Sequence, residues 1–508
     1  MRFSGGALGV TVFLAGIASL ATEIAAARLV APYFGSSNVV WANVIGLVLA
    51  FLAFGYWLGG RLADARPQAS VLGGILLASA LALMVVPFVA RPLLHASLRG
   101  FASLSAGIVI GSFVAVLALF VVPIVLMGAV APFALRLALA SVAQAGRTAG
   151  RLYALSTAGS ILGTFVAALL AIPLVGTQRT LLACAALLAL AAAPLTPRSA
   201  LATVALATGL VALPPGGIKR TAGVIWESES AYQYVRVLQY SDGSRALELN
   251  EGIAQQSVWH PHSVLTGGYW DLFDVMPALL GRPARSALVL GDAGGTIPRA
   301  YAHFFPLLRV DGVELDPTVT DAARRFLGLA AISTLRTFTD DARVFLERST
   351  RRYDLIVVDA YRQPYIPFQL ATREFFELVR RHLAPGGIVA LNVASTPDDH
   401  RLTTGLGATL ADVFPQVWRW RALRFSDLVF GLDRSHPRAR LVARAGTVPR
   451  ALRPLVPLFA RELARVSPGG TVWSDDRAPV EWVTDRMLAG QIARGQGLDE
   501  RYLPTEPP

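Results

Sequence analysis

The stretch SALVLGDAGGTIPRAYAHF, residues 286–304, decides the fold class of the second half of the chain. A short apolar run leads into glycines at 291, 294 and 295, and a helix-like pattern follows. A strand, a glycine turn and a helix in this order form the nucleotide-binding corner of a doubly wound α/β sheet. Because a lone glycine-rich turn also occurs in ordinary loops, the neighbouring segments must support this interpretation.

The segments after residue 304 continue the alternation of strands and helices. They read LRVDGVELDPTVTDAARRF (308–326), RTFTDDARVFL (336–346), YDLIVVDAY (353–361) and GGIVALNVAS (386–395). Apolar runs that alternate with helical patterns predict a largely parallel sheet. We therefore expect a Rossmann-like, methyltransferase-type nucleotide-binding α/β domain over residues 263–508.

Three acids stand at the ends of successive predicted strands. Glu314 could accept hydrogen bonds from both ribose hydroxyls of a nucleoside, Asp341 is placed to meet an adenine amino group, and Asp359 ends the fourth strand. The carboxyl ends of parallel strands form the edge where such sheets bind ligands. Any one of the acids could instead cap a helix, but three caps together are a weaker explanation than one binding crevice.

A small β-domain is expected before the α/β domain, over residues 221–262. YQYVRVLQY (232–240) and RALELNEG (245–252) alternate in polarity, and Asp242 and Gly243 lie between them. An Asp-Gly pair between two alternating runs predicts an antiparallel hairpin.

The first 215 residues are far more apolar than the rest. The whole chain of 508 residues is 54% hydrophobic and only 16% charged, with a mean hydropathy of +0.51. A spanning helix needs roughly 20 apolar residues. We expect a polytopic α-helical membrane domain of about seven helices over residues 1–215, with the lipid bilayer as its partner. The candidate spans lie near 7–30, 39–60, 71–90, 104–127, 152–175, 179–195 and 199–214.

Loop arginines suggest an orientation in the membrane. Arg61, Arg66, Arg136, Arg147 and Arg151 outweigh Arg91 and Arg99 on the other side, which places the N-terminus in the cytoplasm. Seven spans would put the second half outside, whereas six or eight would put it inside. We expect an integral protein of a bacterial-type inner (plasma) membrane with its C-terminal domain in the cytoplasm.

The net charge of +12 does not indicate nucleic-acid binding. It comes almost wholly from arginine, and no basic stripe is interleaved with aromatic residues. The single cysteine, Cys184, lies in an apolar segment, which excludes a disulfide framework and a cysteine-rich zinc site. We expect no nucleic-acid partner and no metal.

Several motifs together resemble the spermidine synthases, the polyamine aminopropyltransferases. They are LNEGIAQQS, GYWDLF, LGDAGGT, VDGVELD, DDARVFL and VVDAY. GYWLGGRLADAR (55–66) and YALSTAGSILGTF (153–165) resemble half of a major facilitator fold, and SDDRAPVEW (474–482) resembles the C-terminal signature of fused chains. The chain is thus similar to membrane proteins that join a major-facilitator part to a spermidine synthase part.

The resemblance implies a reaction and roles for particular residues. Decarboxylated S-adenosylmethionine would be the co-substrate, and its aminopropyl group would pass to a small amine. No tightly bound cofactor would be needed. Because soluble members of the family usually form dimers, the resemblance also implies a homodimer. Asp359 would bind the attacking amine and take its proton. The donor would be held by Gln255, Gly291, Asp292, Gly294, Glu314 and Asp341, and the acceptor by Tyr269, Asp271 and Tyr361.

Three departures from the family pattern leave the substrate open. Ala293 stands where the family has an aspartate, Asp271 ends a Tyr-Trp-Asp segment that is Tyr-His-Glu in the family, and Arg362 replaces a second acid after Asp359. Two like charges about 4 Å apart repel by about 4 kcal/mol at an effective dielectric constant near 20. Either Arg362 points outward or the acceptor is not an ordinary polyamine.

Two alternatives to aminopropyl transfer therefore remain. One is a transferase that uses S-adenosylmethionine itself, because methyltransferases share the nucleoside-binding acids. The other is a non-catalytic sensor of adenosyl or polyamine metabolites that is coupled to the membrane domain.

Overall fold

The structure is a computed structural model in which two compact units are recognised. It describes residues 5–34, 38–100, 107–139, 141, 144–212, 222–250, 254–361, 365–421, 423–467 and 469–493. The first unit comprises residues 1–221 with 228–234, and the second comprises 222–227 with 235–508. Each unit is described by itself.

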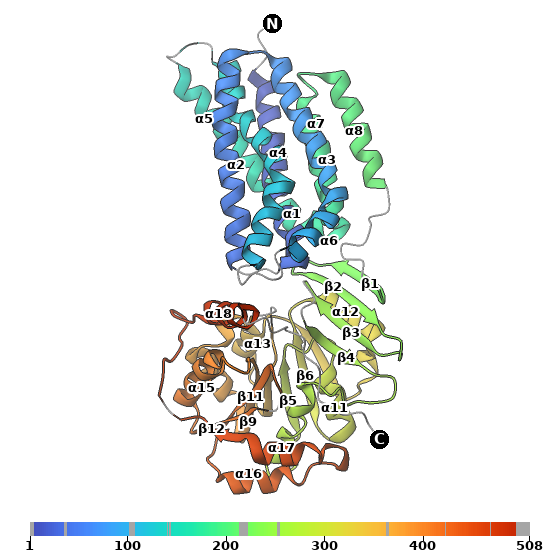
Figure 1. Ribbon diagram of the computed structural model, residues 1–508, viewed down its shortest axis with the longest axis vertical. Helices are drawn as coiled ribbons and strands as arrows, with labels where there is room; N and C mark the ends of the chain where they lie inside the picture. Colours follow the sequence, from blue (N-terminus) through green and yellow to red (C-terminus); the bar gives the residue numbers. More distant parts are fainter. Residues whose placement is uncertain are drawn as a thin grey trace. The chain divides into compact units, whose positions relative to one another are not determined.

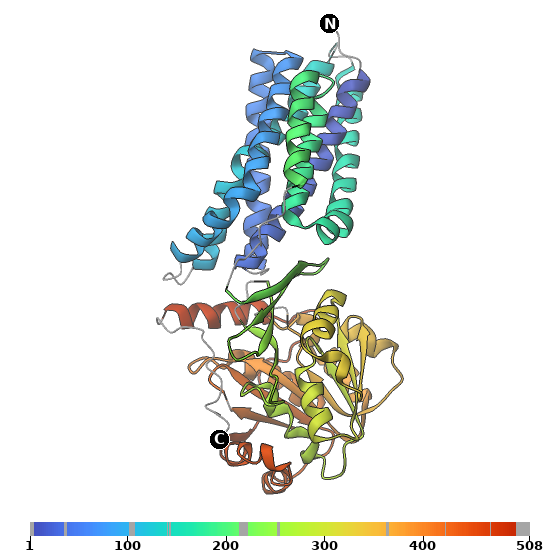
Figure 2. The same ribbon diagram turned by 90° about the vertical axis from the view of Figure 1, so that its right-hand side faces the viewer.

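The first unit is a bundle of apolar helices that run side by side (Figures 1 and 2). The seven apolar segments predicted from the sequence are helical over most of their described residues, and the segment 179–195 ends in a turn at 193–195. The helices are α1 (Gly5–Phe34), α2 (Asn38–Ala65), α3 (Ala69–Gly100), α4 (Gly107–Ala138), α5 (Ala145–Val166), α6 (Ile172–Val175), α7 (Thr177–Ala192) and α8 (Pro197–Ala212); the π-helical turn Ala167–Ala171 joins α5 to α6.

Five of these helical stretches are long and apolar enough to cross a membrane. They are α1, α2, α3, α4 and the continuous run 145–175, whereas α7 and α8 have only 16 residues each. Small residues let these helices pack closely: a Cβ at Gly159 would collide with the backbone of Phe13 on α1. The close approach of backbones is the packing role expected of such glycines in apolar helices.

The small sheet has four strands, of which the sequence predicted the central hairpin. Its strands are β1 (Val224–Glu229), β2 (Tyr234–Gln239), β3 (Arg245–Leu249) and β4 (Gln255–Trp259), in the order β1-β2-β3-β4. β2 and β3 are antiparallel, with Gln239 opposite Arg245. Asp242 Oδ1 accepts a hydrogen bond from the Ser244 backbone at 2.8 Å, which stabilises the turn between them.

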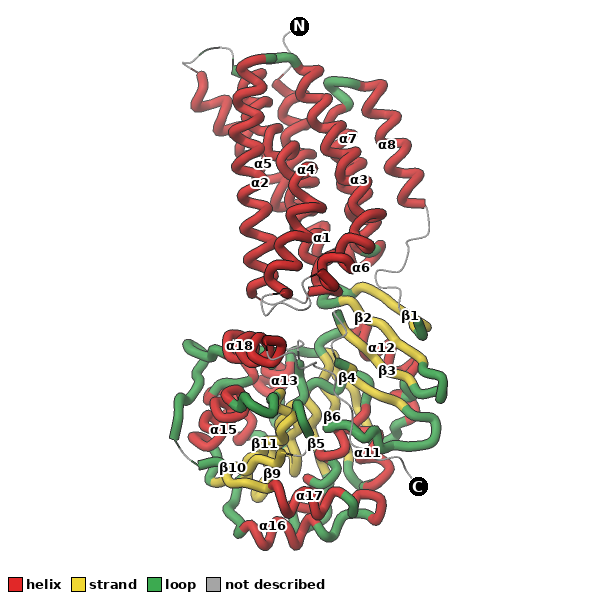
Figure 3. The backbone as a smooth tube through the Cα atoms, in the orientation of Figure 1, coloured by secondary structure: helices red, strands yellow, loops and turns green. Residues whose placement is uncertain are grey.

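The large sheet has eight strands in the order β12-β10-β11-β9-β8-β5-β6-β7. Figure 3 draws strands in yellow and helices in red. β5 to β9 are parallel, whereas β11 is antiparallel to β9 and to β10. This confirms a Rossmann-like, methyltransferase-type domain. The strands are β5 (Ser286–Leu290), β6 (Arg309–Glu314), β7 (Leu335–Thr339), β8 (Tyr353–Val358), β9 (Leu383–Ala394), β10 (Gln416–Arg421), β11 (Ser426–Leu432) and β12 (Leu463–Arg465).

Helices cover both faces of this sheet, because its strands carry apolar side chains on both faces, as β5 shows. Ala287 and Val289 enter one core, whereas Leu288 and Leu290 enter the other. The first face carries α9 (Trp270–Phe273), α10 (Met276–Leu279), α11 (Thr296–Phe304), α16 (Arg438–Ala445) and α17 (Leu455–Glu462); the second carries α13 (Ala342–Arg348), α14 (Arg373–Arg381), α15 (Arg401–Val413) and α18 (Val480–Ala493). A strand that is apolar on both faces is typical of a covered parallel sheet.

The small sheet shares a core with the α/β domain. Val235, Val237 and Leu247 pack against Val319 and neighbouring residues of α12 (Pro317–Phe326). The hairpin region is therefore attached to the nucleotide-binding fold by apolar contacts.

Candidate active site

The glycine turn begins directly after β5 and passes against the residue that follows Asp359. Gly291 has φ +86°, and a Cβ there would lie 2.5 Å from the Ala360 Cα. Only glycine occupies such a conformation without strain, and only glycine leaves room for the neighbouring backbone. This turn therefore brings the ends of β5 and β8 together.

The second part of the turn contacts the small sheet. The Gly294 amide donates a hydrogen bond to Ser257 Oγ at 2.7 Å, and a Cβ at Gly294 would lie 2.6 Å from the Ser257 Cβ. Ser257 lies in β4, so the small sheet closes one side of the turn. The sequence analysis did not identify Ser257, because nothing in the strand pattern distinguishes this hydroxyl from an ordinary one.

Glu314 ends β6 and is half-buried beside the glycine turn. Its Oε2 accepts a hydrogen bond from the Ala293 amide at 3.1 Å, and its Oε1 accepts one from the Asp316 amide at 3.0 Å. Burial raises its pKa to about 7, although these backbone donors act in the opposite direction. Each carboxylate oxygen has two lone pairs, so both can still accept a hydroxyl.

Asp292 is buried behind the turn. Its Oδ1 has no hydrogen-bond partner among the described residues, and a Cβ at Gly312 would lie 2.6 Å from its Oδ2. Burial, helped by the neighbouring Glu314 and opposed by Arg299, raises the pKa of Asp292 to about 8. At neutral pH this side chain is therefore expected to be a neutral acid. Its donor-binding role remains a prediction.

Asp341 is the N-cap of α13. Its Oδ1 accepts hydrogen bonds from the Arg343 amide at 2.9 Å and from the Val344 amide at 3.2 Å. The helix-cap alternative is thus confirmed for Asp341. At the end of β6 the cap of α12 is Asp316, two residues after Glu314. Capping through Oδ1 fixes the direction of the Asp341 carboxyl group, and an adenine contact is still a prediction.

Asp359 follows β8 and is held by side chains from two other elements. Its Oδ2 accepts a hydrogen bond from Tyr269 Oη at 3.1 Å, and its Oδ1 accepts one from Asn392 Nδ2 at 3.2 Å. Burial raises its pKa to about 7, while hydrogen bonds from Asn392, Tyr269 and Trp270 oppose the increase. An acid poised near neutral pH is suited to accept a proton from an amine.

The sequence analysis missed Asn392 and Trp270 as neighbours of Asp359. Asn392 is a polar residue near the end of the otherwise apolar strand β9, and this position was the available signal. Trp270 was noted only as a departure from the family segment. Its ring is tilted by 31° against that of Tyr269, with ring centroids 4.3 Å apart, so the two aromatic residues contact each other next to the acid.

The other predicted acceptor residues have structural partners. Tyr361 Oη donates a hydrogen bond to the Asn392 carbonyl at 2.9 Å and accepts one from the Ala394 amide at 3.0 Å. Asp271 is buried and accepts hydrogen bonds from the Thr266 and Gly267 amides. Both residues therefore support the walls of the site, and contact with an acceptor stays a prediction.

Gln255 and Arg362 are the remaining residues that the sequence analysis singled out for the site. Gln255 Nε2 donates a hydrogen bond to Tyr240 Oη at 2.7 Å, which joins β4 to the end of the hairpin. Arg362 lies outside the described residues. Among the residues that the structure describes, no group of three or more His, Cys, Asp or Glu side chains could hold a metal ion.

Comparison with known proteins shows which class of domain this site resembles. Residues 269–421 match the family model described as the spermine/spermidine synthase domain. This interval includes Tyr269, the glycine turn, Glu314, Asp341 and Asp359. This part of the second unit is thus similar to spermidine synthase domains.

Individual relatives extend the comparison. A probable polyamine aminopropyl transferase of Bifidobacterium longum is 36% identical over 214 residues, which are 42% of this chain and 47% of that protein. A polyamine aminopropyltransferase of Vibrio vulnificus is 27% identical over 291 residues, which are 53% of this chain and 91% of that protein. The chain thus spans about half the length of the first relative and about nine tenths of the second.

Solved structures include similar chains. A crystal structure of a probable spermidine synthase from Corynebacterium glutamicum is 20% identical, covers 50% of this chain and 99% of its own, and has a TM-score of 0.38.

Proposed function

We propose that the second unit is an aminopropyltransferase that moves an aminopropyl group from decarboxylated S-adenosylmethionine to an amine. The observation that carries this proposal is the half-buried Asp359 carboxylate, with a pKa raised to about 7, in the domain that matches the spermidine synthase model. Tyr269 and Asn392 fix both of its oxygens, so the acid is oriented before a substrate arrives.

The proposed reaction needs little beyond positioning and a base. The donor carbon is activated because it is bonded to a positively charged sulfonium sulfur. The amine nitrogen attacks that carbon, a carbon–nitrogen bond forms, and the carbon–sulfur bond breaks with its electron pair staying on sulfur, which releases methylthioadenosine. Asp359 takes the proton that the nitrogen loses. In its anionic form Asp359 also attracts the ammonium form of the acceptor before the reaction.

The donor site in this proposal lies at the ends of β5, β6 and β7. Glu314 is proposed to accept hydrogen bonds from the ribose hydroxyls and Asp341 to meet the adenine, next to the turn that contains Gly291, Asp292 and Gly294. Gln255 is proposed to help hold the donor, and Tyr269, Asp271 and Tyr361 are proposed to bound the acceptor side. The Ala293 amide already contacts Glu314 at 3.1 Å, which supports placing the nucleoside against this turn.

The experiment that tests the proposal compares two donors on the intact chain in detergent. Decarboxylated S-adenosylmethionine and S-adenosylmethionine are each incubated with a panel of amines, and products are identified by mass spectrometry. We expect methylthioadenosine and an aminopropylated amine from the first donor only. Transfer of a methyl group from S-adenosylmethionine would replace the proposal with a methyltransferase function. Tight donor binding by the wild-type chain without any product would favour the sensor.

We further propose that the helical unit anchors the protein in a bacterial-type inner membrane with the second unit in the cytoplasm. The five long apolar helices support membrane association. Aminopropyl donors are cytosolic metabolites, so the enzyme proposal requires this side. A C-terminal reporter fusion that is active only outside the membrane would contradict it. A homodimer, also proposed, is tested by mass photometry of the chain in detergent.

A further inference from the structure

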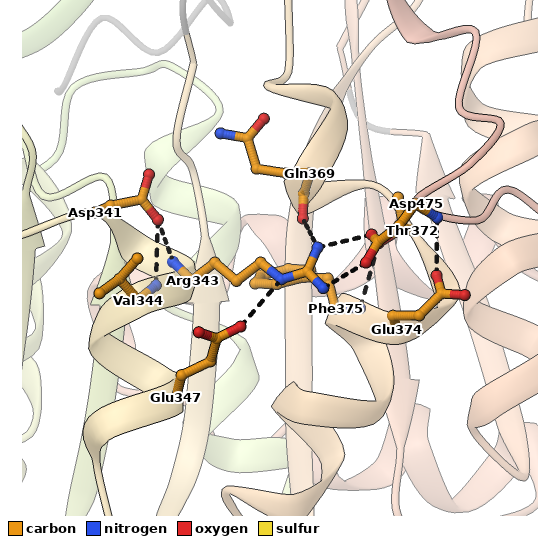
Figure 4. A network of polar contacts seen from close by, with 9 residues as sticks. All are labelled: Asp341, Arg343, Val344, Glu347, Gln369, Thr372, Glu374, Phe375 and Asp475. Atoms are coloured by element: carbon orange, nitrogen blue, oxygen red, sulfur yellow. Dashed lines mark hydrogen bonds and ion pairs between the residues drawn. The ribbon is translucent and has the colours of Figure 1, made fainter.

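The C-terminal segment contains an acid that connects two elements of the proposed site (Figure 4). Asp475 lies in the SDDRAPVEW motif, which the proposed function does not use. Its two oxygens accept hydrogen bonds from Arg343 Nη1 and Nη2 at 2.7 and 2.6 Å. Thr372 Oγ1 donates to the same carboxylate at 2.7 Å. Asp475 thus makes a bidentate ion pair and a further hydrogen bond.

The two partners of Asp475 belong to elements that begin at the site. Arg343 is in the first turn of α13, two residues after the cap Asp341, and its own amide donates to that cap. Thr372 is the N-cap of α14 and ends the segment that leads from Asp359. Arg343 Nη1 also donates to the Gln369 carbonyl at 3.2 Å. The cluster in Figure 4 therefore ties the predicted adenine side to the segment after the base.

Asp475 is itself anchored on both sides along the chain. Trp473 is buried, and its amide donates a hydrogen bond to Thr409 Oγ1 of α15 at 3.0 Å. The Trp473 carbonyl accepts a hydrogen bond from the Arg373 amide at 2.8 Å. Farther along, Asp485 of α18 accepts a hydrogen bond from Tyr365 Oη at 2.6 Å. Residues 473–485 thus hold residues 365–373 at several separate points.

The Arg343–Asp475 pair differs from an ordinary surface ion pair. The Arg343 side chain is only 20% exposed, whereas that of Asp475 is 43% exposed. The hydrogen bonds from Arg343 lower the pKa of Asp475, so the carboxylate is ionised across the physiological range. A bidentate arginine–carboxylate pair fixes the relative orientation of the two side chains in addition to their distance, whereas a single contact between flexible charged side chains does not.

We propose that Asp475 is a positioning residue that holds the Asp341 end of α13 and residues 365–373 in one arrangement. This inference rests on the proposed function, because it takes Asp341, at the start of α13, as a donor contact, and Asp359 as the base. Asp475 touches neither substrate. Loss of its charge is expected to loosen both elements together, so that the binding of donor and acceptor weakens while the chemical step at Asp359 is preserved.

The test uses the full chain in detergent and the variants Asp475→Asn, Arg343→Gln and the double variant. Hydrogen exchange of peptides that cover 341–348 and 365–376 is measured without substrate. We expect about tenfold faster exchange in both regions for each single variant, and no further increase in the double variant, because contacting residues are not additive. Arg282→Gln is the matched control, since Arg282 pairs with Asp354 near the start of β8 at 2.6 Å; it is expected to leave both regions unchanged.

Kinetics supply the second measurement. With the donor and acceptor found for the wild-type chain, we expect Asp475→Asn to raise KM by about fivefold to tenfold and to change kcat by less than about twofold. Unchanged exchange in the variants, additive effects in the double variant, or a loss confined to kcat would overturn the inference. If the wild-type chain has no activity, the proposed function fails, but the exchange measurement still decides whether Asp475 couples the two regions.

Discussion

Tyr269 donates a hydrogen bond to Asp359, with 3.1 Å between its Oη and the Asp359 Oδ2. The two residues are 90 positions apart in the sequence, and Tyr269 is on the approach to α9 whereas Asp359 follows β8. This bond stabilises the anionic form of an acid whose pKa burial raises to about 7. The hydrogen bond from Tyr269 therefore affects the pH range in which Asp359, the proposed base, is ionised.

Tyr269→Phe is expected to shift the activity profile toward higher pH. A hydrogen bond to a charged group contributes about 1.5–3 kcal/mol, and 1.36 kcal/mol corresponds to one pKa unit. Since the bond favours the anion, its loss raises the pKa of Asp359 by roughly one unit or more, and the rising limb of kcat/KM moves with it. The measurement is kcat/KM between pH 5.5 and 9.5.

Tyr353→Phe is the control for this shift. Tyr353 Oη also donates to a carboxylate, Asp311 Oδ2 at 2.9 Å, but this pair lies at the other end of β8. We expect its profile to match the wild type. If the two variants shift alike, the Tyr269 bond has no special connection to the base.

Asp359→Asn is expected to remove turnover while donor binding survives. The amide keeps the shape of the side chain but cannot accept a proton, and a general base contributes typically 10²–10⁴-fold to the rate. Product formation by mass spectrometry and donor affinity by calorimetry separate these effects. Asp321→Asn, on the exposed surface of α12, serves as a charge-matched control. Turnover within about threefold of the wild type would exclude Asp359 as the base.

Asp292→Asn is expected to stabilise the protein at alkaline pH. Burial raises the pKa of Asp292 to about 8 in the folded protein, whereas the pKa of an aspartate in an unfolded chain is about 3.9. Between pH values near these two pKa values, Asp292 is protonated in the folded chain but ionised in the unfolded chain. The free energy of unfolding therefore falls as pH rises, by up to about 1.4 kcal/mol per pH unit. Asparagine carries no charge and abolishes this loss.

The measurement is the thermal unfolding midpoint from pH 5 to pH 9. We expect the midpoint of Asp292→Asn to exceed that of the wild type by a margin that widens with pH. Asp321→Asn again provides the comparison, because that acid is exposed. A constant difference across the pH range would show that Asp292 is ionised in the folded protein throughout.

Gly291→Ala is expected to destabilise the domain more than Gly386→Ala. Both glycines have positive φ, +86° and +76°, which costs an alanine about 1–3 kcal/mol. At Gly386 the nearest atom to a new Cβ is 3.9 Å away, whereas at Gly291 the Ala360 Cα is 2.5 Å away. The difference between the two unfolding midpoints therefore isolates the close approach of the turn to β8. Equal losses would mean that the turn can shift away from β8.

Much of the architecture could be predicted from local patterns. The alternation of apolar runs with glycine turns and helical stretches predicted the parallel sheet, and the Asp-Gly turn predicted the β2–β3 hairpin. Both follow from properties of neighbouring residues, because strand and helix periods are visible in the sequence. Seven apolar segments were also predicted, but α7 and α8 are shorter than a usual span, and length and composition alone identify five.

The roles of individual acids were less predictable. Glu314 and Asp341 both follow strands, yet Asp341 caps a helix and Glu314 does not. The sequence placed Asp292 in the glycine turn, but only the structure showed that its side chain is buried against Gly312. A sequence gives the position of a carboxyl group along a strand, whereas its direction depends on the backbone amides that reach it.

Local patterns in the chain were enough to predict the alternation of strands and helices from β5 to β9, the apolar first half and the acids at the strand ends, because each depends on residues that are close together in the sequence. Only the tertiary structure decided that Tyr269 and Asn392 hold Asp359, and that Asp475 holds Arg343 and Thr372. These contacts join residues that are far apart in sequence, and burial among them sets the pKa of Asp359. No local pattern encodes such distances, because they arise only when the sheet brings its strand ends to one edge.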